Sequence, residues 1–229
     1  MPTLFPAPPI PTLPVEGTSA RFPVHRIYCI GRNFADHARE MGATVDRGQP
    51  VFFMKPADAI VAGGGAVPYP PATGDLHHEV ELVVALGRDA DGVVAVADAT
   101  ALVFGYGVGL DLTRRDLQAA AKAKGLPWDT GKGFDHSAPA GALSPAADVG
   151  EPGARRIRLQ VNGGTRQDST LDQMVFAVPE VLHELSKLYA LKAGDLVFMG
   201  TPAGVAALRR GDRFEATIDG LATLSGQIV

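Results

Sequence analysis

The sequence predicts an α+β fold that is mainly β, with a few short helices. Short apolar runs bounded by glycine, proline and asparagine recur along the chain, and only three segments carry helical start and stop signals. These helical segments do not alternate regularly with the strands, which argues against a βαβ array. The 229 residues are 46% hydrophobic and 20% charged, which is enough for one globular domain with a sizeable core.

Seven runs are expected to form strands. His78–Leu86 changes from partial alternation to a fully apolar run, as expected for a strand that becomes buried on both faces. Asn162-Gly163 predicts a two-residue hairpin turn, and Asp219-Gly220 marks another turn. The expected strands are Val24–Ile30, Val51–Met54, His78–Leu86, Leu102–Leu112, Arg156–Val161, Leu196–Met199 and Arg213–Ile218.

Three helices are expected. Asn33 is the predicted N-cap of the first, and Gly42 stops it. Thr113 and Asp116 are spaced like a capping box at the start of the second, and Gly125 follows its end. The third begins with proline at a favourable first position. The expected helices are Phe34–Met41, Thr113–Lys124 and Pro179–Tyr189.

The beginning of the chain differs in composition from the rest. Seven prolines lie within the first 23 residues, so this stretch is expected to be extended, either lying on the fold or partly disordered. We therefore expect a proline-rich N-terminal arm over residues 1–23 and a single compact domain over residues 24–229.

Charge and hydropathy exclude several classes of partner. The net charge of −4 and the pI of about 5.8 give no general attraction to nucleic acid or to an anionic membrane. No apolar stretch reaches the roughly 18 residues that a membrane span needs, and no secretory signal is recognisable. The single Cys29 cannot form an internal disulfide, which is compatible with a cytoplasmic location.

Two acids at strand spacing are the first candidate site. Glu79 and Glu81 point to the same face of the expected strand, while Val80 and Leu82 point to the other face. Paired carboxylates repel each other unless a cation lies between them, and hard divalent cations prefer such oxygen ligands. A solvent-facing polar stripe on an edge strand is the alternative, but the apolar residues 83–86 argue for a buried strand.

A third acid follows another apolar strand. Asp111 comes at the end of the expected strand Leu102–Leu112, where an acid beside a helix N-terminus is the simpler alternative. With Glu79 and Glu81 it would supply one face of an octahedral site that leaves positions for water and substrate, as Mg²⁺ requires. His77 lies two residues before Glu79 and is interpreted as a supporting partner rather than a ligand.

A histidine and a glutamate on one helical turn are the second candidate site. His37 and Glu40 are three residues apart in the first expected helix, so their side chains are neighbours. The carboxylate can orient the imidazole and raise its pKa, or it can itself share a proton with a bound water. The alternative is an ordinary polar pair on the surface.

Six segments occur in a fixed order: Tyr28–Met41, Phe53–Pro56, His77–Leu82, Gly109–Gln118, Gly131–Asp135 and Gly200–Val205. Together they resemble the acylpyruvase branch of the fumarylacetoacetate hydrolase family. Each motif alone is weak, but the ordered set is specific, and the resemblance extends over residues 24–229. It implies a β-roll fold for that catalytic domain and a homodimer.

The resemblance also implies roles for ten residues. Glu79, Glu81 and Asp111 match the metal ligands, for Mg²⁺ or Mn²⁺. His37 and Glu40 match the water-activating pair, and Lys132 matches a lysine that contacts substrate near the metal. The substrate-binding positions are matched by Arg32, Arg115, Gln118 and Thr201.

The implied activity is metal-dependent hydrolysis of the carbon–carbon bond of an acylpyruvate. Closer likeness within the branch indicates fumarylpyruvate, which would give fumarate and pyruvate. Its far carboxylate needs a cation, for which Arg32, Arg115 and Lys55 are the candidates. Decarboxylation of oxaloacetate, or hydration or isomerisation of a 2-oxo-dienoate, is an alternative use of the same site. A non-enzymatic binding module with a structural cation is a further alternative.

Overall fold

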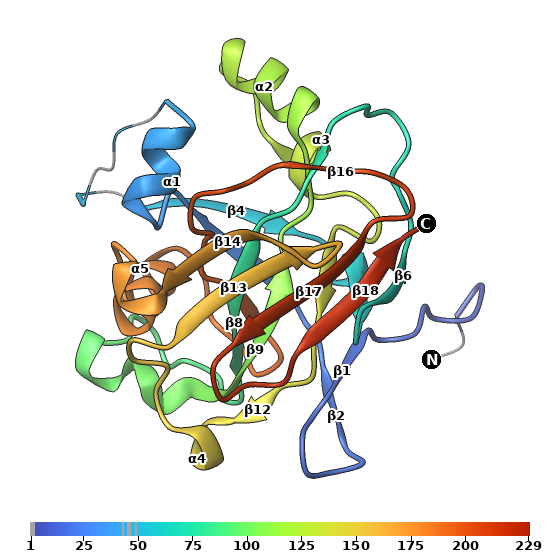
Figure 1. Cartoon of the computed structure of the whole chain (residues 1–229). Helices are drawn as coiled ribbons and strands as arrows, with labels where there is room; N and C mark the ends of the chain where they lie inside the picture. The colour runs from blue at the N-terminus through green and yellow to red at the C-terminus, as the bar shows by residue number, and fades with distance from the viewer. Residues whose placement is uncertain (1–2, 43, 45–46, 49) are drawn as a thin grey trace.

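The computed structural model describes residues 3–42, 44, 47–48 and 50–229. Its largest element is a curled sheet of eight strands (Figure 1). In spatial order the strands are β4 (Val51–Lys55), β3 (Ile27–Gly31), β15 (Leu196–Phe198), β8 (Val80–Leu86), β9 (Val103–Leu110), β11 (Ala138–Ala140) and β5 (Ile60–Ala62), with β12 (Ser144–Pro145) also paired to β9. The strands β8 and β9 therefore lie in the middle of this sheet.

A second sheet of five strands lies against β8 and β9, in front of them in Figure 1. Its order is β14 (Gly164–Thr170), β13 (Arg156–Val161), β17 (Arg213–Ile218), β18 (Leu224–Ile228) and β6 (Gly65–Val67). Asn162 and Gly163 join β13 to β14 with φ of 52° and 78°, so the expected hairpin is confirmed.

Smaller elements surround the two sheets. A three-stranded sheet contains β10 (Thr113–Arg114), β7 (Leu76–His77) and β16 (Ala207–Leu208). The α-helices are α1 (Ala35–Glu40), α2 (Arg115–Ala123), α3 (Asp129–Lys132), α4 (Ala146–Val149) and α5 (Val178–Leu188). The 3₁₀ helices are η1 (Ala57–Ala59), η2 (Val96–Leu102) and η3 (Leu171–Gln173). In the described ranges no helix has the length and apolarity of a membrane span.

The central sheet is buried on both faces. The even-numbered residues of β8, from Val80 to Leu86, belong to the core cluster shared with the five-stranded sheet. The odd-numbered Val83 and Ala85 belong to a second cluster on the opposite face. Because the acids at 79 and 81 share the odd parity, they continue this second face beyond its apolar part. The mainly β class predicted from the sequence is confirmed.

The proline-rich beginning contributes to the second cluster. Strands β1 (Thr12–Pro14) and β2 (Arg21–Pro23) form an antiparallel hairpin. Leu13 is buried there, and the ring of Phe22 stacks on Phe104 with centroids 5.4 Å apart. This part of the N-terminal segment therefore lies on the fold, whereas the division into an arm and a catalytic domain stays a prediction.

Two predicted helix caps are wrong. Asn33 does not cap α1, because its amide donates to the carbonyls of Phe176 and Met199 at 3.0 and 2.8 Å. Thr113 does not begin a helix, since it pairs in β10 and α2 begins at Arg115. The Asn33 and Thr113 side chains both form hydrogen bonds with residues distant in sequence instead of capping a helix.

Candidate metal centre and active site

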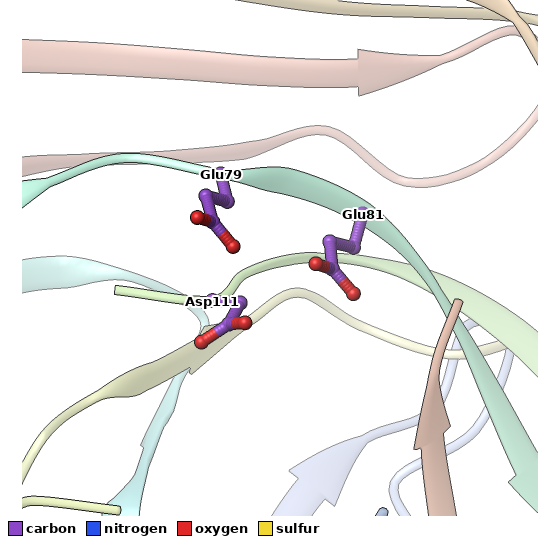
Figure 2. A group of neighbouring side chains, drawn as sticks. All are labelled: Glu79, Glu81 and Asp111. Atoms are coloured by element: carbon purple, nitrogen blue, oxygen red, sulfur yellow. The ribbon is translucent and has the colours of Figure 1, made fainter. Parts of the chain in front are cut away.

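Three buried carboxylates meet at the end of the central strand pair. Glu79 immediately precedes β8, Glu81 lies within it, and Asp111 immediately follows β9. One oxygen from each lies within 4.8 Å of the others, and Figure 2 shows the three side chains pointing into a common space. Each residue is less than 5% exposed. The structure therefore brings together the three acids predicted to bind a metal.

The register of β8 against β9 creates this arrangement. Glu81 lies opposite Gly109, and the Asp111 amide donates to the Glu79 carbonyl at 2.9 Å. A Cβ on Gly109 would lie 2.6 Å from the ring of Phe198 and 2.7 Å from Val83. Glycine is therefore required where β9 passes over the second core face, one step before that face becomes acidic.

Three basic side chains neutralise part of the cluster. Lys132 Nζ donates to Glu79 at 2.7 Å, to Asp111 at 2.5 Å and to the Thr113 hydroxyl at 2.8 Å. Arg115 donates to Glu79, and Lys55 Nζ lies 2.8 Å from Asp111 Oδ1. These groups stand beside Glu79 and Asp111 and leave Glu81 with a different environment.

The pKa shifts follow from that distribution of charge. Burial alone would raise the pKa of Glu79, but Lys132 and Arg115 hold it well below its usual range. Burial and the neighbouring Asp111 and Glu79 raise the pKa of Glu81 well above its usual range. Burial opposes the charge of Lys132, yet Asp111 and Glu79 raise its pKa to about 12. The cluster lacks positive charge at Glu81.

The donor set fits a hard divalent cation. Among the described residues Glu81 has no ion-pair partner, and its Oε2 accepts only the Gly200 amide, at 2.8 Å. Asp111 Oδ1 is buried and contacts Lys55 without hydrogen-bond geometry, so it keeps an unused lone pair. Buried, incompletely satisfied carboxylate oxygens are the ligands that Mg²⁺ and Mn²⁺ prefer.

The imidazole and carboxylate predicted to activate water lie on α1. His37 Nδ1 is 3.2 Å from Glu40 Oε2. Since a carboxylate only accepts, Nδ1 carries the hydrogen and a neutral His37 keeps a lone pair on Nε2. The Gly204 amide donates to Glu40 Oε1 at 3.1 Å and fixes the carboxylate from the other side. This arrangement is that of an oriented proton acceptor.

One cavity joins the two groups. It is lined by the three acids and by His37, whereas Glu40 contacts the imidazole and does not line the cavity. The other predicted residues that line it are Arg32, Arg115, Gln118, Lys132 and Thr201. All of the ten predicted site residues except Glu40 therefore line one cavity, although their individual roles stay predictions.

Lys55 is not available for a substrate carboxylate, and this expectation is wrong. Its side chain is fully buried and lies outside the cavity lining. It donates to the backbone carbonyls of Leu112, at 3.1 Å, and of Lys132. The lysine is thus a buried support for Asp111, because it holds positive charge on the side of that acid away from the cavity.

Sequence reasoning missed Lys122 and Trp128 in the cavity wall. Lys122 Nζ lies 5.0 Å from the centroid of the Trp128 ring. Its pKa is lowered by partial burial and by the charges of Arg115 and Arg32. The helical spacing of Arg115, Gln118 and Lys122, with intervals of three and four residues, places them on one face of α2 and could have revealed the lysine.

His77 lies where the sequence suggested. Its Nδ1 is 3.4 Å from Arg115 Nε and its Nε2 is 2.9 Å from Asp75. Because Arg115 also binds Glu79, His77 contacts the acid cluster through the arginine. Burial and Arg115 lower its pKa.

Comparison with known proteins places this geometry in a family. The family model described as fumarylacetoacetate (FAA) hydrolase C-terminal matches residues 26–229. The chain belongs to the fumarylacetoacetate hydrolase family. A structure of fumarylpyruvate hydrolase from Pseudomonas aeruginosa, in complex with Mn²⁺ and pyruvate, is 46% identical with a TM-score of 0.95, and the match covers 100% of this chain and 99% of that one. The family and the β-roll fold predicted from the sequence are thus confirmed.

Relatives within this family carry different names. Oxaloacetate tautomerase FAHD1, mitochondrial, from Rattus norvegicus is 43% identical over 198 residues, which cover 86% of this chain and 89% of the relative. A 5-carboxymethyl-2-hydroxymuconate delta-isomerase from Mycobacterium smegmatis is 30% identical with a TM-score of 0.79, and the match covers 93% of this chain and 86% of that one. Family membership therefore establishes a hydrolase, isomerase or tautomerase type of enzyme and leaves its substrate to be inferred.

Proposed function

We propose that the chain hydrolyses fumarylpyruvate to fumarate and pyruvate, with Mg²⁺ or Mn²⁺ as its cofactor. The observation that carries this proposal is the shared cavity, which joins an acid cluster whose Glu81 has no basic partner among the described residues to an oriented imidazole. The likeness to a fumarylpyruvate hydrolase with Mn²⁺ and pyruvate supports the substrate and the cofactor.

Glu79, Glu81 and Asp111 would hold the cation through carboxylate oxygens. When bound, it would supply Lewis-acid stabilisation of negative charge on the carboxylate and 2-oxo oxygens of the substrate. The three acids are balanced in number by the buried groups of Lys55, Lys132 and Arg115. A divalent cation therefore brings two uncompensated positive charges, and a dicarboxylate substrate matches them.

Lys132 and the polar cavity residues would orient the pyruvate half of the substrate. The Lys132 ammonium is buried among the acids and keeps its charge, so it can stabilise negative charge that develops beside it. Gln118 and Thr201 line the same cavity and offer an amide and a hydroxyl to the substrate's oxygens. Both side chains are nearly fully buried, which limits their freedom before substrate enters.

His37 would accept the proton of the attacking water. Its Nε2 takes the proton while the water oxygen bonds to the distal carbonyl carbon, and Glu40 stabilises the resulting imidazolium. Collapse of the tetrahedral adduct breaks the bond to the pyruvate methylene carbon. The electron pair leaves with pyruvate, which regains a proton from His37, and the acyl part leaves as fumarate.

Two exposed cations suit the far carboxylate of fumarylpyruvate. Arg32 and Lys122 line the cavity, and among the described residues neither forms an ion pair with an acid. Burial and the charges of Arg115 and Arg32 lower the pKa of Lys122, and an anion placed between Arg32 and Lys122 would offset the repulsion between these two cations. We therefore assign the far carboxylate to Arg32 and Lys122 rather than to Lys55.

The second candidate function is tautomerisation of oxaloacetate, which the name of the rat relative favours. The His37–Glu40 pair can carry a proton in that reaction as well, without activating water. The two functions differ in their products, because only hydrolysis cleaves a carbon–carbon bond.

The experiment is a product assay on a substrate panel. Purified protein is given fumarylpyruvate, acetylpyruvate or oxaloacetate with Mn²⁺, Mg²⁺ or chelator, and pyruvate is followed with lactate dehydrogenase while the enol band is followed by absorbance. We expect metal-dependent pyruvate release that is fastest from fumarylpyruvate. Loss of the oxaloacetate enol band with no pyruvate release from any of the three compounds would instead establish the tautomerase.

We also propose that the protein is a cytoplasmic homodimer, the dimer being inferred from likeness to the family. Its net charge of −4 gives no general attraction to nucleic acid or to an anionic membrane, so we expect it to bind neither. Light scattering coupled to size-exclusion chromatography tests the dimer, and a mass near the 23.9 kDa of one chain would refute it. Fractionation of the source cells tests the location.

A further inference from the structure

We propose that Gln167 is a positioning residue that turns the hydroxyl hydrogen of Thr201 toward the cavity. This inference rests on the proposed function, in which Thr201 binds an oxygen of the substrate. Gln167 lies on β14, at the edge of the five-stranded sheet, and is 1% exposed. It does not line the cavity, so it can act only through the groups that it contacts.

Two backbone groups fix the orientation of the Gln167 amide. The Val80 amide, which can only donate, is 3.1 Å from Gln167 Oε1. The Pro202 carbonyl, which can only accept, is 2.8 Å from Gln167 Nε2. Exchanging the oxygen and nitrogen of the amide would break both bonds at once, so the assignment follows from backbone chemistry.

This orientation dictates the role of the Thr201 hydroxyl. Gln167 Nε2 lies 2.7 Å from Thr201 Oγ1 and can only donate, so the hydroxyl oxygen accepts. Within the part of the chain that the structure describes, the hydroxyl hydrogen has no acceptor. Thr201 is 2% exposed and lines the cavity, so the oxygen of a bound substrate is the available acceptor.

His78 secures the amide from a third side. Its Nδ1 is 3.0 Å from Gln167 Oε1, which is already an acceptor, so Nδ1 carries the hydrogen. The remaining nitrogen, Nε2, is buried and has no hydrogen-bond partner among the residues that the structure describes. Oε1 of Gln167 thus accepts from both the Val80 amide and His78 Nδ1, and this pair of donors leaves the amide no second stable orientation.

The same strand holds the rest of the turn that follows β15. A Cβ on Gly204 would lie 2.1 Å from the carbonyl oxygen of Arg166, so the turn packs directly on β14. This turn presents the Gly200 amide to Glu81 and the Gly204 amide to Glu40, and its Thr201 lines the cavity. Gln167 is thus the side chain through which β14 sets one donor of a preorganised series.

A double-mutant cycle tests the inference. In Gln167→Glu the new carboxylate can accept from Val80 but must also accept from Thr201, which turns the hydroxyl hydrogen away from the cavity. Thr201→Val removes the hydroxyl. We expect each single variant to raise KM for fumarylpyruvate and the Kd for pyruvate with Mn²⁺ by about tenfold, corresponding to about 1.4 kcal/mol. Both changes remove the same hydrogen bond from the Thr201 hydroxyl to the substrate. The double variant should therefore bind pyruvate no more weakly than Thr201→Val does.

Controls separate positioning from a general structural role. Gln160→Glu, on the neighbouring strand β13, should leave KM and the pyruvate Kd unchanged. Gln167→Met, which directs the hydroxyl neither way, should fall between wild type and Gln167→Glu and replaces it if that variant does not fold. If a Gln167 substitution weakens pyruvate binding equally with and without the Thr201 hydroxyl, the inference is wrong. Pyruvate binding needs no turnover, so failure of the proposed hydrolysis appears separately, as an inactive wild type.

Discussion

The acid cluster and His37 of the His37–Glu40 pair line the same cavity, but the cluster and the pair are built differently. The cluster lies on β8 and β9 in the middle of the largest sheet, with its acids buried. The pair lies on α1, a helix of six residues without a side-chain cap, and the Glu40 side chain is 34% exposed. The residues proposed to bind the metal are thus held in the core, whereas the pair proposed to transfer the proton lies at the edge of the core.

This difference predicts which substitutions couple function to stability. Each acid of the cluster interacts with other buried charges, so changing one alters the electrostatic balance of the core. Within the described ranges, changing Glu40 disturbs only hydrogen bonds with His37 and the Gly204 amide, near solvent. Substitutions in the cluster should therefore move both metal response and stability, whereas those in the pair should move activity alone.

Glu81→Gln is expected to have the largest effect. The amide oxygen can still accept from Gly200, but the variant loses a metal ligand, so activity should fall by more than about 10³-fold. With chelator its stability should exceed that of wild type, because the substitution removes the cost of burying the Glu81 charge and its repulsion from Asp111 and Glu79. At a metal concentration of 100 times its Kd, the free energy of unfolding of wild type should rise by about 2.7 kcal/mol. This increase should be absent from the variant.

Thermal melts with and without Mn²⁺ measure this response. Glu215→Gln, at an exposed position of β17, is the matched control and should keep the full metal-induced shift. A Glu81→Gln protein that still gains stability from Mn²⁺ would place the metal elsewhere.

Glu40→Gln should reduce turnover by about 10² to 10⁴-fold, because it removes the negative charge that stabilises a protonated His37. Its stability should stay within about 0.5 kcal/mol of wild type, since the substitution is isosteric and partly exposed. The Mn²⁺-induced shift in melting temperature should be unchanged. Steady-state kinetics and melts on the same preparation check this, with Glu184→Gln on α5 as control. A lost metal response would mean that the pair is coupled to the cluster after all.

Lys55→Met tests the buried side of the cluster. The variant leaves Asp111 facing less positive charge and two backbone carbonyls without a donor, so the free energy of unfolding should fall by about 3 to 5 kcal/mol. Urea denaturation with chelator measures it, and Lys124→Met at an exposed position is the control. Mn²⁺ should restore part of the loss. A fall below about 1 kcal/mol would show that Asp111 does not depend on Lys55.

The acid cluster could be predicted because strand geometry is local. Two-residue alternation placed Glu79 and Glu81 on one face without knowledge of the fold. The glycines of β9 are sites of close packing, as Gly109 against Phe198 illustrates. Local geometry could not show which strand neighbours β8, so Asp111 was assigned to the cluster only from its place at the end of an apolar strand and from the family resemblance.

The errors and omissions have one physical cause, which is that side-chain partners distant in sequence are not encoded locally. Asn33 and Thr113 have the composition of helix caps, but tertiary partners bind their side chains. Lys55 is basic and lies near the site, yet only the structure shows which side of Asp111 it occupies. Gln167 carries no local signal, since its importance depends on how β14 meets Val80 and the turn at Thr201.

Arg32 tests the contrast between the buried acid cluster and the exposed edge of the cavity, and its substitution should have the smallest effect. It connects β3 to α1 in the left-handed region, with φ of 61°, and it lines the cavity. Arg32→Ala and Arg32→Gly both remove the cation, so both should raise KM for fumarylpyruvate by about tenfold, which corresponds to about 1.4 kcal/mol. Only glycine relieves the backbone strain, so the glycine variant should be more stable than the alanine variant by about 1 kcal/mol.

Urea denaturation compares the stabilities of the two Arg32 variants, and acetylpyruvate, which lacks the far carboxylate, serves as the substrate control for KM. Equal stability would mean that the connection relaxes out of the left-handed region in solution, and an equal KM effect on acetylpyruvate would mean that Arg32 does not bind the far carboxylate.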